Sequence, residues 1–512
     1  MHAGATWALN QIVGTSPLGR VLKDVFPKYK AYLRLLCLAY YLVVNKDSAL
    51  CNYEEFAECT WLPYSKGVTS GSISRLLRSI NKEQISKYLN KLNQAYRKEH
   101  GEEISERRFC ALNSTSITSY SANISSVDYG HNKDLIDAPQ TNVLTIIDHL
   151  NGELIYFRNF DGNVLDVNTV RNTLSELVMM NIDYSNAILV TDRGYGSNGN
   201  WDDMLRNNMS FVSNARLNLN AAIKEIINEH YHELLDWNSA VPFLNQNVVT
   251  VEIEWKYDEF PVESKRQQKK ASKELFAHLY YSKDINDEMS RRLQPMLCTA
   301  MTQLKTDPKK LTEAQKKLIG QYVTKAESKY SINMSKVDKT LRYAGVRVLV
   351  SDTVKDAVQC CVAYEERNQV EYAFNTLKAR LNYNRTKVHS TEAWEGKLYV
   401  QMLVTAIGGM VRSRIKLYNE TVRMDKKTYR VHYDSDQKLL AKLNNIYMTQ
   451  FREGWIFDEV VGKKKELFKI LNVQVPTVVQ VIAVETEGED PDVFGQSVDF
   501  DGLSVKDDQE EL

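Results

Sequence analysis

The order of apolar runs between residues 105 and 215 constrains the fold more than any other feature. The runs "RFCAL", "NVLTIID" and "ELIYFRNF" come first, and Asn151-Gly152 between the last two predicts a tight hairpin. The helical pattern "VNTVRNTLSELVMM" follows, and then "AILVTDRGYG", a fourth buried strand. Three strands, a helix and a fourth strand predict an α/β fold built on an open sheet.

Two of the expected strands end at polar residues that carry oxygen. The first run ends at Asn113, and the fourth ends abruptly at Asp192 and a glycine turn. Open α/β sheets place their ligands beyond the ends of strands, so both side chains are candidate site residues.

The chain is too long for one hydrophobic core, because it has 512 residues. The α/β rhythm breaks at "VVTVEIEWKY", an alternating strand followed by lysine-rich helical pattern, and resumes at "GVRVLVSD". The tail has too little apolar content to fold alone. We therefore expect six parts: a helical N-terminal domain at 1–104, the first part of the core at 105–215, a β-containing insertion domain at 216–343, the second part of the core at 344–420, a helical C-terminal region at 421–483 and an acidic tail at 484–512.

Cysteine usage and hydropathy exclude several classes of protein. The seven cysteines include no CxxC pair, which predicts a reducing compartment and argues against structural zinc. His230 and His232 have no further ligand at metal-binding spacing. The longest apolar run, "LRLLCLAYYLVV", contains Arg34 and is too short to span a membrane. We expect a cytoplasmic protein in which this run is a buried helix.

The net charge of zero hides a division of charge along the chain. From Glu485 onward there are eleven acidic residues against one lysine, which leaves 64 basic and 54 acidic residues before that position. A basic body with an acidic tail permits a polyanionic partner.

A short helix pair near the N-terminus carries several cations. "GSISRLLRSI" is followed by "NKEQISKYLNKLNQAYRK", where Asn81 and Gln84 fit the N-cap and N3 positions of a capping box. Exposed cations on two helices joined by a tight turn would suit DNA phosphates, although an ordinary helical hairpin explains the pattern equally well. The cations are Arg75, Arg78, Lys82, Lys87 and Lys91.

Four polar residues share a helical spacing in "YEERNQVEYAFNTLKARL", residues 364 to 381. On a helical wheel they lie at roughly 0°, 300°, 340° and 320°, in one stripe beside the apolar face. They are Tyr364, Arg367, Glu371 and Lys378. A carboxylate flanked by cations and a phenol at the border of the core is placed like an active-site group, whereas chance spacing on a solvated face is the alternative.

Carboxylates that converge from separate elements are what two-metal phosphoryl transfer requires, and oxygen ligands suit Mg²⁺. The spacing Tyr364-x2-Arg367-x3-Glu371-x6-Lys378 matches the Tyr-Arg-Glu-Lys signature of DDE transposases of bacterial insertion sequences, in the insertion sequence four group. The surrounding words "STSITSY", "YFRNFDGNVLD", "TDRGYGS" and "EGKLYVQML" are similar to that family as well. The resemblance extends over roughly residues 15 to 475 and makes chance spacing a poor explanation of the stripe.

The resemblance implies a fold and an activity. The fold would be an RNase H-like mixed-sheet core interrupted by a β-rich insertion. The activity would be metal-dependent cleavage and strand transfer of double-stranded DNA, at inverted-repeat ends and through hairpin ends. Two Mg²⁺ ions would serve as cofactors, with Mn²⁺ as a substitute, and a homodimer would hold the ends in a paired-end complex in the bacterial, nucleoid-containing cytoplasm.

The resemblance also assigns roles by position. Asp192 would bridge the two ions and Glu371 would hold one of them, with residue 113 as the first ligand. Tyr364, Arg367 and Lys378 would contact the DNA backbone beside the scissile bond. Hairpin-forming enzymes also stack a flipped base on an aromatic side chain. Trp255 and Trp237 are candidates for that role, with core packing the favoured interpretation of each.

The first catalytic position departs from the family, because it holds Asn113 where the family has aspartate. Asparagine keeps the shape and one carbonyl oxygen but removes a negative charge between two dications, which should weaken catalysis. Three explanations compete: a deliberate inactivating change, natural decay into a DNA-binding protein, or a substitute carboxylate at Asp128 or Asp134. We favour inactivation at a single site, because the other signature residues are intact.

Two other functions remain as alternatives to the transposase. A non-catalytic DNA-binding protein derived from a transposase would bind element ends without ever cutting them. A structure-specific nuclease on the same fold would cleave without strand transfer, and the Tyr-Arg-Lys stripe argues against it.

Overall fold

The computed structural model divides into two compact units, which are described separately. The first unit comprises residues 1–190, 207–209 and 365 onward, and the second comprises 191–206 and 210–364. The residues described are 1–45, 49–64, 68–100, 107–133, 136–149, 152–217, 220–259, 269–326, 329–367, 385–424, 435–451, 454–476 and 478–480.

The N-terminal part of the first unit is helical, as the periodicity predicted. Asn81 and Gln84 form the expected capping box, with the Gln84 amide 2.9 Å from Asn81 Oδ1 and the Asn81 amide 3.1 Å from Gln84 Oε1. The apolar run at 33–44 lies in a largely buried helix. The helices are α1 (Gly4–Gly14), α2 (Pro17–Val25), α3 (Ala31–Val44), α4 (Tyr53–Cys59), α5 (Ser70–Ser79) and α6 (Lys82–His100).

The strands of the first unit follow in the order β3-β2-β1-β4. They are β1 (Arg108–Thr118), β2 (Gln140–Asp148), β3 (Leu154–Asp161) and β4 (Ala187–Thr191), whose last residue begins the second unit. β1 with β2, and β2 with β3, are antiparallel, and Gly152 with φ +67° occupies the expected hairpin. The helix α7 (Thr169–Met179) precedes β4, so the predicted strand and helix order and the α/β class with a mixed sheet are confirmed.

The prediction that the first strand ends at Asn113 was wrong. β1 continues to Thr118, and Asn113 lies in its middle, paired with Thr145 of β2. The sequence "STSIT" contains only one large apolar residue, so its polar side chains concealed a strand that is buried along its length.

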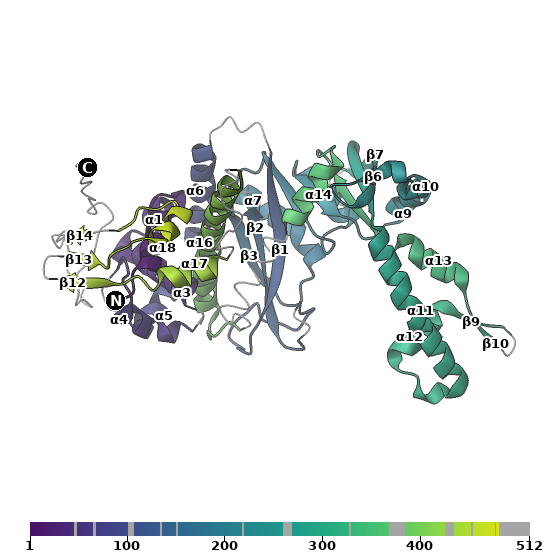
Figure 1. Ribbon diagram of the computed structural model, residues 1–512, viewed down its shortest axis with the longest axis horizontal. Helices are drawn as coiled ribbons and strands as arrows, with labels where there is room; N and C mark the ends of the chain where they lie inside the picture. The colour runs from purple at the N-terminus through teal and green to yellow at the C-terminus, as the bar shows by residue number, and fades with distance from the viewer. Residues whose placement is uncertain are drawn as a thin grey trace. The chain divides into compact units, whose positions relative to one another are not determined.

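The long helix α16 (Thr391–Met424) organises the first unit and confirms the apolar helix expected there. It passes between the N-terminal helices and the strands β1 to β3 (Figure 1). Tyr399 on this helix is fully buried against Phe26, Tyr88 and Phe157. Gly396 lies so close to α5 that a Cβ atom would fall 2.0 Å from the Leu77 carbonyl oxygen.

The C-terminal part of the first unit contains strands as well as helices. The expected helices are present as α17 (Asp436–Leu443) and α18 (Lys463–Ile470). Three short strands form an additional antiparallel sheet, β12 (Met448–Phe451), β13 (Gly454–Phe457) and β14 (Val478–Gln480). Strands of three or four residues are too short to give a periodic signal in the sequence.

The second unit is built on the strand order β5-β11-β8-β7-β6, in which neighbouring strands are antiparallel. The strands are β5 (Ser210–Asn214), β6 (Ala240–Val241), β7 (Gln246–Asp258), β8 (Lys270–Tyr281) and β11 (Val346–Ser351). β7 alternates between half-buried and exposed residues, and "GVRVLVSD" is a strand, as predicted. Because β11 pairs with both β5 and β8, the strands of the expected insertion extend one sheet.

Helices complete the second unit: α8 (Asn198–Arg206), α9 (Ala221–Glu229), α10 (Tyr231–Leu235) and α14 (Ala357–Glu366). A separate group of three helices packs on a small apolar core of Leu293, Leu297, Tyr322 and Val337 (Figure 1). This group is α11 (Lys283–Thr306), α12 (Glu313–Tyr322) and α13 (Met334–Tyr343), with the hairpin β9 (Val323–Ala326) and β10 (Lys329–Ile332). Among the described residues, no helix is both long and apolar enough to cross a membrane.

The contact of Gly396 with α5 predicts a measurable stability effect. Gly396→Ala should lower the free energy of unfolding by about 1–3 kcal/mol, because the added methyl overlaps rigid backbone. Gly408→Ala on the same helix is the matched control, since its Cβ would approach only the flexible Arg412 side chain, at 3.2 Å. The control should be neutral or gain up to about 1 kcal/mol from helix propensity. Equal midpoints for the two variants in thermal denaturation would contradict this account of the packing.

Candidate active site

Asn113 is a buried residue of β1 in the first unit. Asn113 is only 7% exposed. Its Oδ1 accepts a hydrogen bond of 2.8 Å from the Ser114 amide. Successive residues of a strand point to opposite faces, so Ser114 faces away from Asn113.

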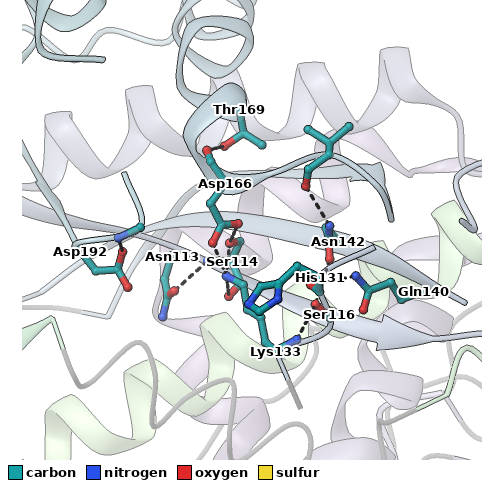
Figure 2. Close-up of polar contacts among 12 residues, drawn as sticks. Asn113, Ser114, Ser116, His131, Lys133, Gln140, Asn142, Asp166, Thr169 and Asp192 are labelled. Carbon is teal, nitrogen blue, oxygen red and sulfur yellow. Dashed lines mark hydrogen bonds and ion pairs between the residues drawn. The ribbon is translucent and has the colours of Figure 1, made fainter. Parts of the chain in front are cut away.

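Ser114 belongs to a charged network on its own face of the sheet (Figure 2). Its hydroxyl donates to Asp166 Oδ1 over 2.6 Å, and Lys133 Nζ lies 2.8 Å from Asp166 Oδ2. The same ammonium group donates to the Ser114 carbonyl oxygen over 2.8 Å and to the Ser114 hydroxyl. An ammonium group has three protons, so these three contacts occupy all of them.

The network fixes the connection between β1 and β2 to the strand that carries Asn113. The Lys133 amide donates to Ser116 Oγ, and Ser116 Oγ donates to Asn142 Oδ1 over 3.0 Å. Gln140 Nε2 donates to the His131 carbonyl oxygen over 3.1 Å (Figure 2). Residues 131 to 133 are therefore held on both strands, and the backbone beside Asn113 is rigidly placed.

The structure argues against Asp128 as a substitute for the missing carboxylate. Asp128 forms a bridge with Gln140, which pairs with Thr118 at the far end of β1. Thr118 lies five residues along the strand from Asn113, which corresponds to roughly 17 Å at the rise of a β-strand. The other candidate, Asp134, lies outside the described residues.

Asp192 directly follows β4, as predicted, and belongs to the second unit. Its Oδ1 accepts a hydrogen bond from the Gly194 amide, and its carbonyl oxygen accepts one of 3.1 Å from the Tyr195 amide. Arg216 Nε donates to the Arg193 carbonyl oxygen over 2.7 Å, and the Arg216 guanidinium also contacts the Gly194 carbonyl oxygen. The turn that holds this carboxylate is thus fixed by its own backbone and by one arginine.

Only the first four residues of the helix expected over 364 to 381 lie within the described part of the chain. Tyr364 lies in α14, which ends at Glu366, and Arg367 lies in the turn that follows. Arg367 directly follows the last residue of α14, so the single helical stripe stays a prediction for these two residues. Glu371 and Lys378 fall in residues 368–384, outside the part of the chain that the structure describes.

Arg367 is buried in the first unit beside an unusual histidine. Arg367 is 5% exposed, and so is His149 at the end of β2. Neither ring nitrogen of His149 has a hydrogen-bond partner within the described ranges. Burial, together with the positive charges of Arg367 and Lys416, lowers the pKa of His149 to about 4.

The five N-terminal cations do not form one surface. Arg75 and Arg78 are exposed on α5, and Lys82 and Lys87 are exposed on α6. Lys87 and Lys91 lie roughly 140° and 180° around α6 from Lys82. Lys91 pairs with Asp24 of α2, while Lys82 is 3.3 Å from Glu395.

The two tryptophans proposed for base stacking have opposite environments. Trp255 is half-buried. It packs edge-to-face on the buried Trp201 with ring centroids 5.3 Å apart and donates from Nε1 to Asp202 over 2.8 Å, so it covers the edge of the core. Core packing was wrong for Trp237, which is 89% exposed on a short 3₁₀ turn.

No group of three or more His, Cys, Asp or Glu side chains is arranged to hold a metal within the described residues. Two oxygen donors of the proposed site lie within the described residues, and oxygen is the ligand atom that a hard cation prefers. Asp192 offers a carboxylate and Asn113 an amide oxygen, and oxygen donors are what Mg²⁺ selects. The seven cysteines all lie within the described ranges and form no disulfide, and four of them are buried.

Sequence reasoning missed three features of the site. They are Asn214 and Arg347, which both contact Tyr364, and the Ser114–Lys133–Asp166 network. β5, which carries Asn214, is five residues long, and its "SFVSN" gives no periodic pattern. Lys133 lies in an irregular segment, where spacing rules carry no information.

Comparison with known proteins assigns the class. The family model described as Transposase DDE domain matches residues 104–407, more than half of the chain. The chain therefore belongs to the family of transposases with a DDE domain. The matched segment contains Asn113, Asp192 and Glu371.

A search of solved structures gives a more remote similarity. The cryo-EM structure of the piggyBac transposase synaptic complex with hairpin DNA is similar to this chain with a TM-score of 0.39 and 11% sequence identity. The alignment covers 86% of this chain and 79% of that chain. No curated protein matches the chain.

The Lys133 network predicts an energetic coupling. Lys133→Met should lower the free energy of unfolding by about 1–3 kcal/mol, because it leaves a half-buried carboxylate and hydroxyl without their donor. In the Asp166→Asn background the same change should cost less, since no carboxylate remains to be neutralised. Lys256→Met is the control, because its pair with Glu254 is exposed, with side chains 68% and 64% exposed. Additive unfolding energies in a double-mutant cycle would contradict the network.

His149 predicts a pH dependence of stability. Its pKa in the folded chain is about 4, below its ordinary value of 6.5. Between these pH values the unfolded chain binds a proton at this histidine and the folded chain does not. This contribution is present above pH 6.5 and is lost as the pH falls toward 4. His149→Phe should therefore gain stability relative to the natural chain by about 1–3 kcal/mol across that window. Urea unfolding at several pH values measures this, with the exposed His232→Phe as control; identical pH slopes for all three chains would exclude the effect.

Proposed function

We propose that this protein is a DNA transposase that binds inverted-repeat ends and performs cut-and-paste cleavage and strand transfer through hairpin ends. The observation that supports the proposal is the match of the Transposase DDE domain model to residues 104–407, the segment in which Asn113, Asp192 and Glu371 lie. A homodimer would hold two ends in a paired-end complex in the bacterial cytoplasm, associated with the nucleoid.

Two Mg²⁺ ions, or Mn²⁺, would be held by Asn113, Asp192 and Glu371. Bound ions would activate water and a 3′-hydroxyl as nucleophiles and neutralise charge on the phosphate. The protein's own contribution is preorganisation: the backbone beside Asn113 is pinned by Lys133, and the Asp192 turn is pinned by Arg216.

Tyr364, Arg367 and Lys378 would contact DNA phosphates beside the site. Tyr364 is half-buried and accessible, whereas contact by Arg367, at 5% exposure, requires the turn after α14 to move. Arg75, Arg78, Lys82 and Lys87 are exposed and would contact DNA phosphates, with Lys87 on a different side of α6 from Lys82. Lys82 and Lys91 would first have to leave Glu395 and Asp24. We also propose that the chain is organised in the six parts that the sequence predicts, from the helical N-terminal domain at 1–104 to the acidic tail at 484–512.

Asn113 makes the chain catalytically impaired in this proposal. An amide cannot supply the charge that a carboxylate places between two dications. Asp128 lies at the other end of β1, too far from Asn113 to replace the carboxylate of an aspartate there. This distance favours inactivation at a single site. The alternative is a transposase-derived protein that binds DNA ends without catalysis.

Restoring the carboxylate tests the proposal. Asn113→Asp should nick and join a labelled duplex that carries the element's terminal repeat, in the presence of Mg²⁺ or Mn²⁺, at a rate at least about a hundredfold above that of the chain with Asn113. The double variant N113D/D192N is the control and should be inactive. Tight binding of the duplex without cleavage by either chain would favour the non-catalytic protein. Cleavage without joining would favour a nuclease.

A further inference from the structure

Tyr364 is held by two residues from neighbouring strands of the second unit. Asn214 Nδ2, at the end of β5, donates to the Tyr364 hydroxyl oxygen over 2.8 Å. The Arg347 guanidinium on β11 lies 5.4 Å from the centroid of the Tyr364 ring and 5.1 Å from that of Tyr280. One residue therefore contacts the polar end of the tyrosine and the other its aromatic face.

Asn214 also contacts the turn that carries Asp192. A Cβ atom at Gly196 would fall 1.9 Å from the Asn214 carbonyl oxygen, so the two backbones are in direct contact and only glycine fits there. The backbone of Asn214 thus packs on the Asp192 turn, while its side chain reaches Tyr364.

The position of Asn214 is fixed by both neighbouring segments. Leu349 of β11 pairs with Asn214, and the amide of the next residue, Ala215, donates to the Val348 carbonyl oxygen over 2.9 Å. On the other side, Thr191 Oγ1 donates to Ser213 Oγ over 2.9 Å, immediately before Asp192. Asn214 therefore has little freedom to move relative to the Asp192 turn.

We propose that Asn214 is a positioning residue, which sets the direction of the Tyr364 hydroxyl relative to the Asp192 turn while Arg347 holds the ring. The inference rests on the proposed function, in which Tyr364 contacts a DNA phosphate.

The direction of the hydrogen bond gives the inference its physical content. The Asn214 amide group is the donor, so the phenol oxygen acts as acceptor toward β5. A phenol can accept and donate at once, and an accepted bond restricts where its own proton points. A fixed hydroxyl loses less rotational freedom when it binds a phosphate, which strengthens the contact without adding one.

The test is a double-mutant cycle in DNA binding on the full chain, with Asn113 unchanged so that the duplex stays intact. Fluorescence anisotropy would measure the affinity of N214L, Y364F and N214L/Y364F for a duplex carrying the terminal repeat. Each single variant should weaken binding by about three- to tenfold, the range of one hydrogen bond. The double variant should be no weaker than Y364F within about twofold, because without the hydroxyl Asn214 has nothing to orient.

The matched control is N228L, which removes another Asn–Tyr contact of the same unit. Tyr343 Oη donates to Asn228 Oδ1 over 3.0 Å at the surface, and this pair has no assigned role. N228L should leave DNA affinity unchanged, and thermal denaturation of every variant reports any loss of fold.

The outcomes separate the two proposals. Equal losses from N214L in the presence and absence of the Tyr364 hydroxyl would overturn the positioning role while leaving the DNA contact of Tyr364 intact. A loss from Y364F with none from N214L would overturn it as well. If neither the natural chain nor any variant binds the duplex, both the proposed function and this inference fall.

Discussion

The need to satisfy buried polar groups in β1 determines much of the first unit. Asn113, Ser114, Thr115, Ser116 and Thr118 are each less than 8% exposed, although polar side chains without partners are costly to bury. Asn113 accepts from the Ser114 amide within the strand, whereas Ser114 and Ser116 find partners outside it, in Lys133, Asp166 and Asn142. Because these partners lie in the β1–β2 connection, after β3 and on β2, one polar strand organises three separate segments around the candidate site.

The sequence predicts the periodic elements well, because burial on one face imposes a regular pattern. The buried helix α3, the alternating strand β7 and the short buried strand β4 all follow from spacing alone. The polar half of β1 and the five-residue β5 escape the same reasoning, since neither shows an apolar period. Asn214 lies on the second of these, so the residue that contacts Tyr364 was invisible to spacing rules.

The signature residues show how motif spacing and structure can diverge. A spacing of three predicts that Tyr364 and Arg367 share one helical stripe. In the structure Tyr364 lies in α14 and Arg367 directly after its last residue, and the two residues belong to different compact units. Arg367 is surrounded by protein beside His149, whose pKa is lowered first by burial and then by the neighbouring positive charge of Arg367. Motif spacing identifies the signature residues along the chain. Burial determines which of their side chains is accessible to a ligand in this conformation.

Position 113 places stability and cation binding in opposition. The Asn113 amide oxygen accepts the Ser114 amide hydrogen, a contact that a carboxylate of the same shape would also make. The difference between the two residues is therefore electrostatic. Asn113 is only 7% exposed, so a carboxylate at this position would carry a desolvation penalty that raises its pKa unless a cation lies beside it. The neutral amide avoids that penalty. In the proposed function, asparagine at this position would favour the metal-free fold, where aspartate would favour the metal-bound one.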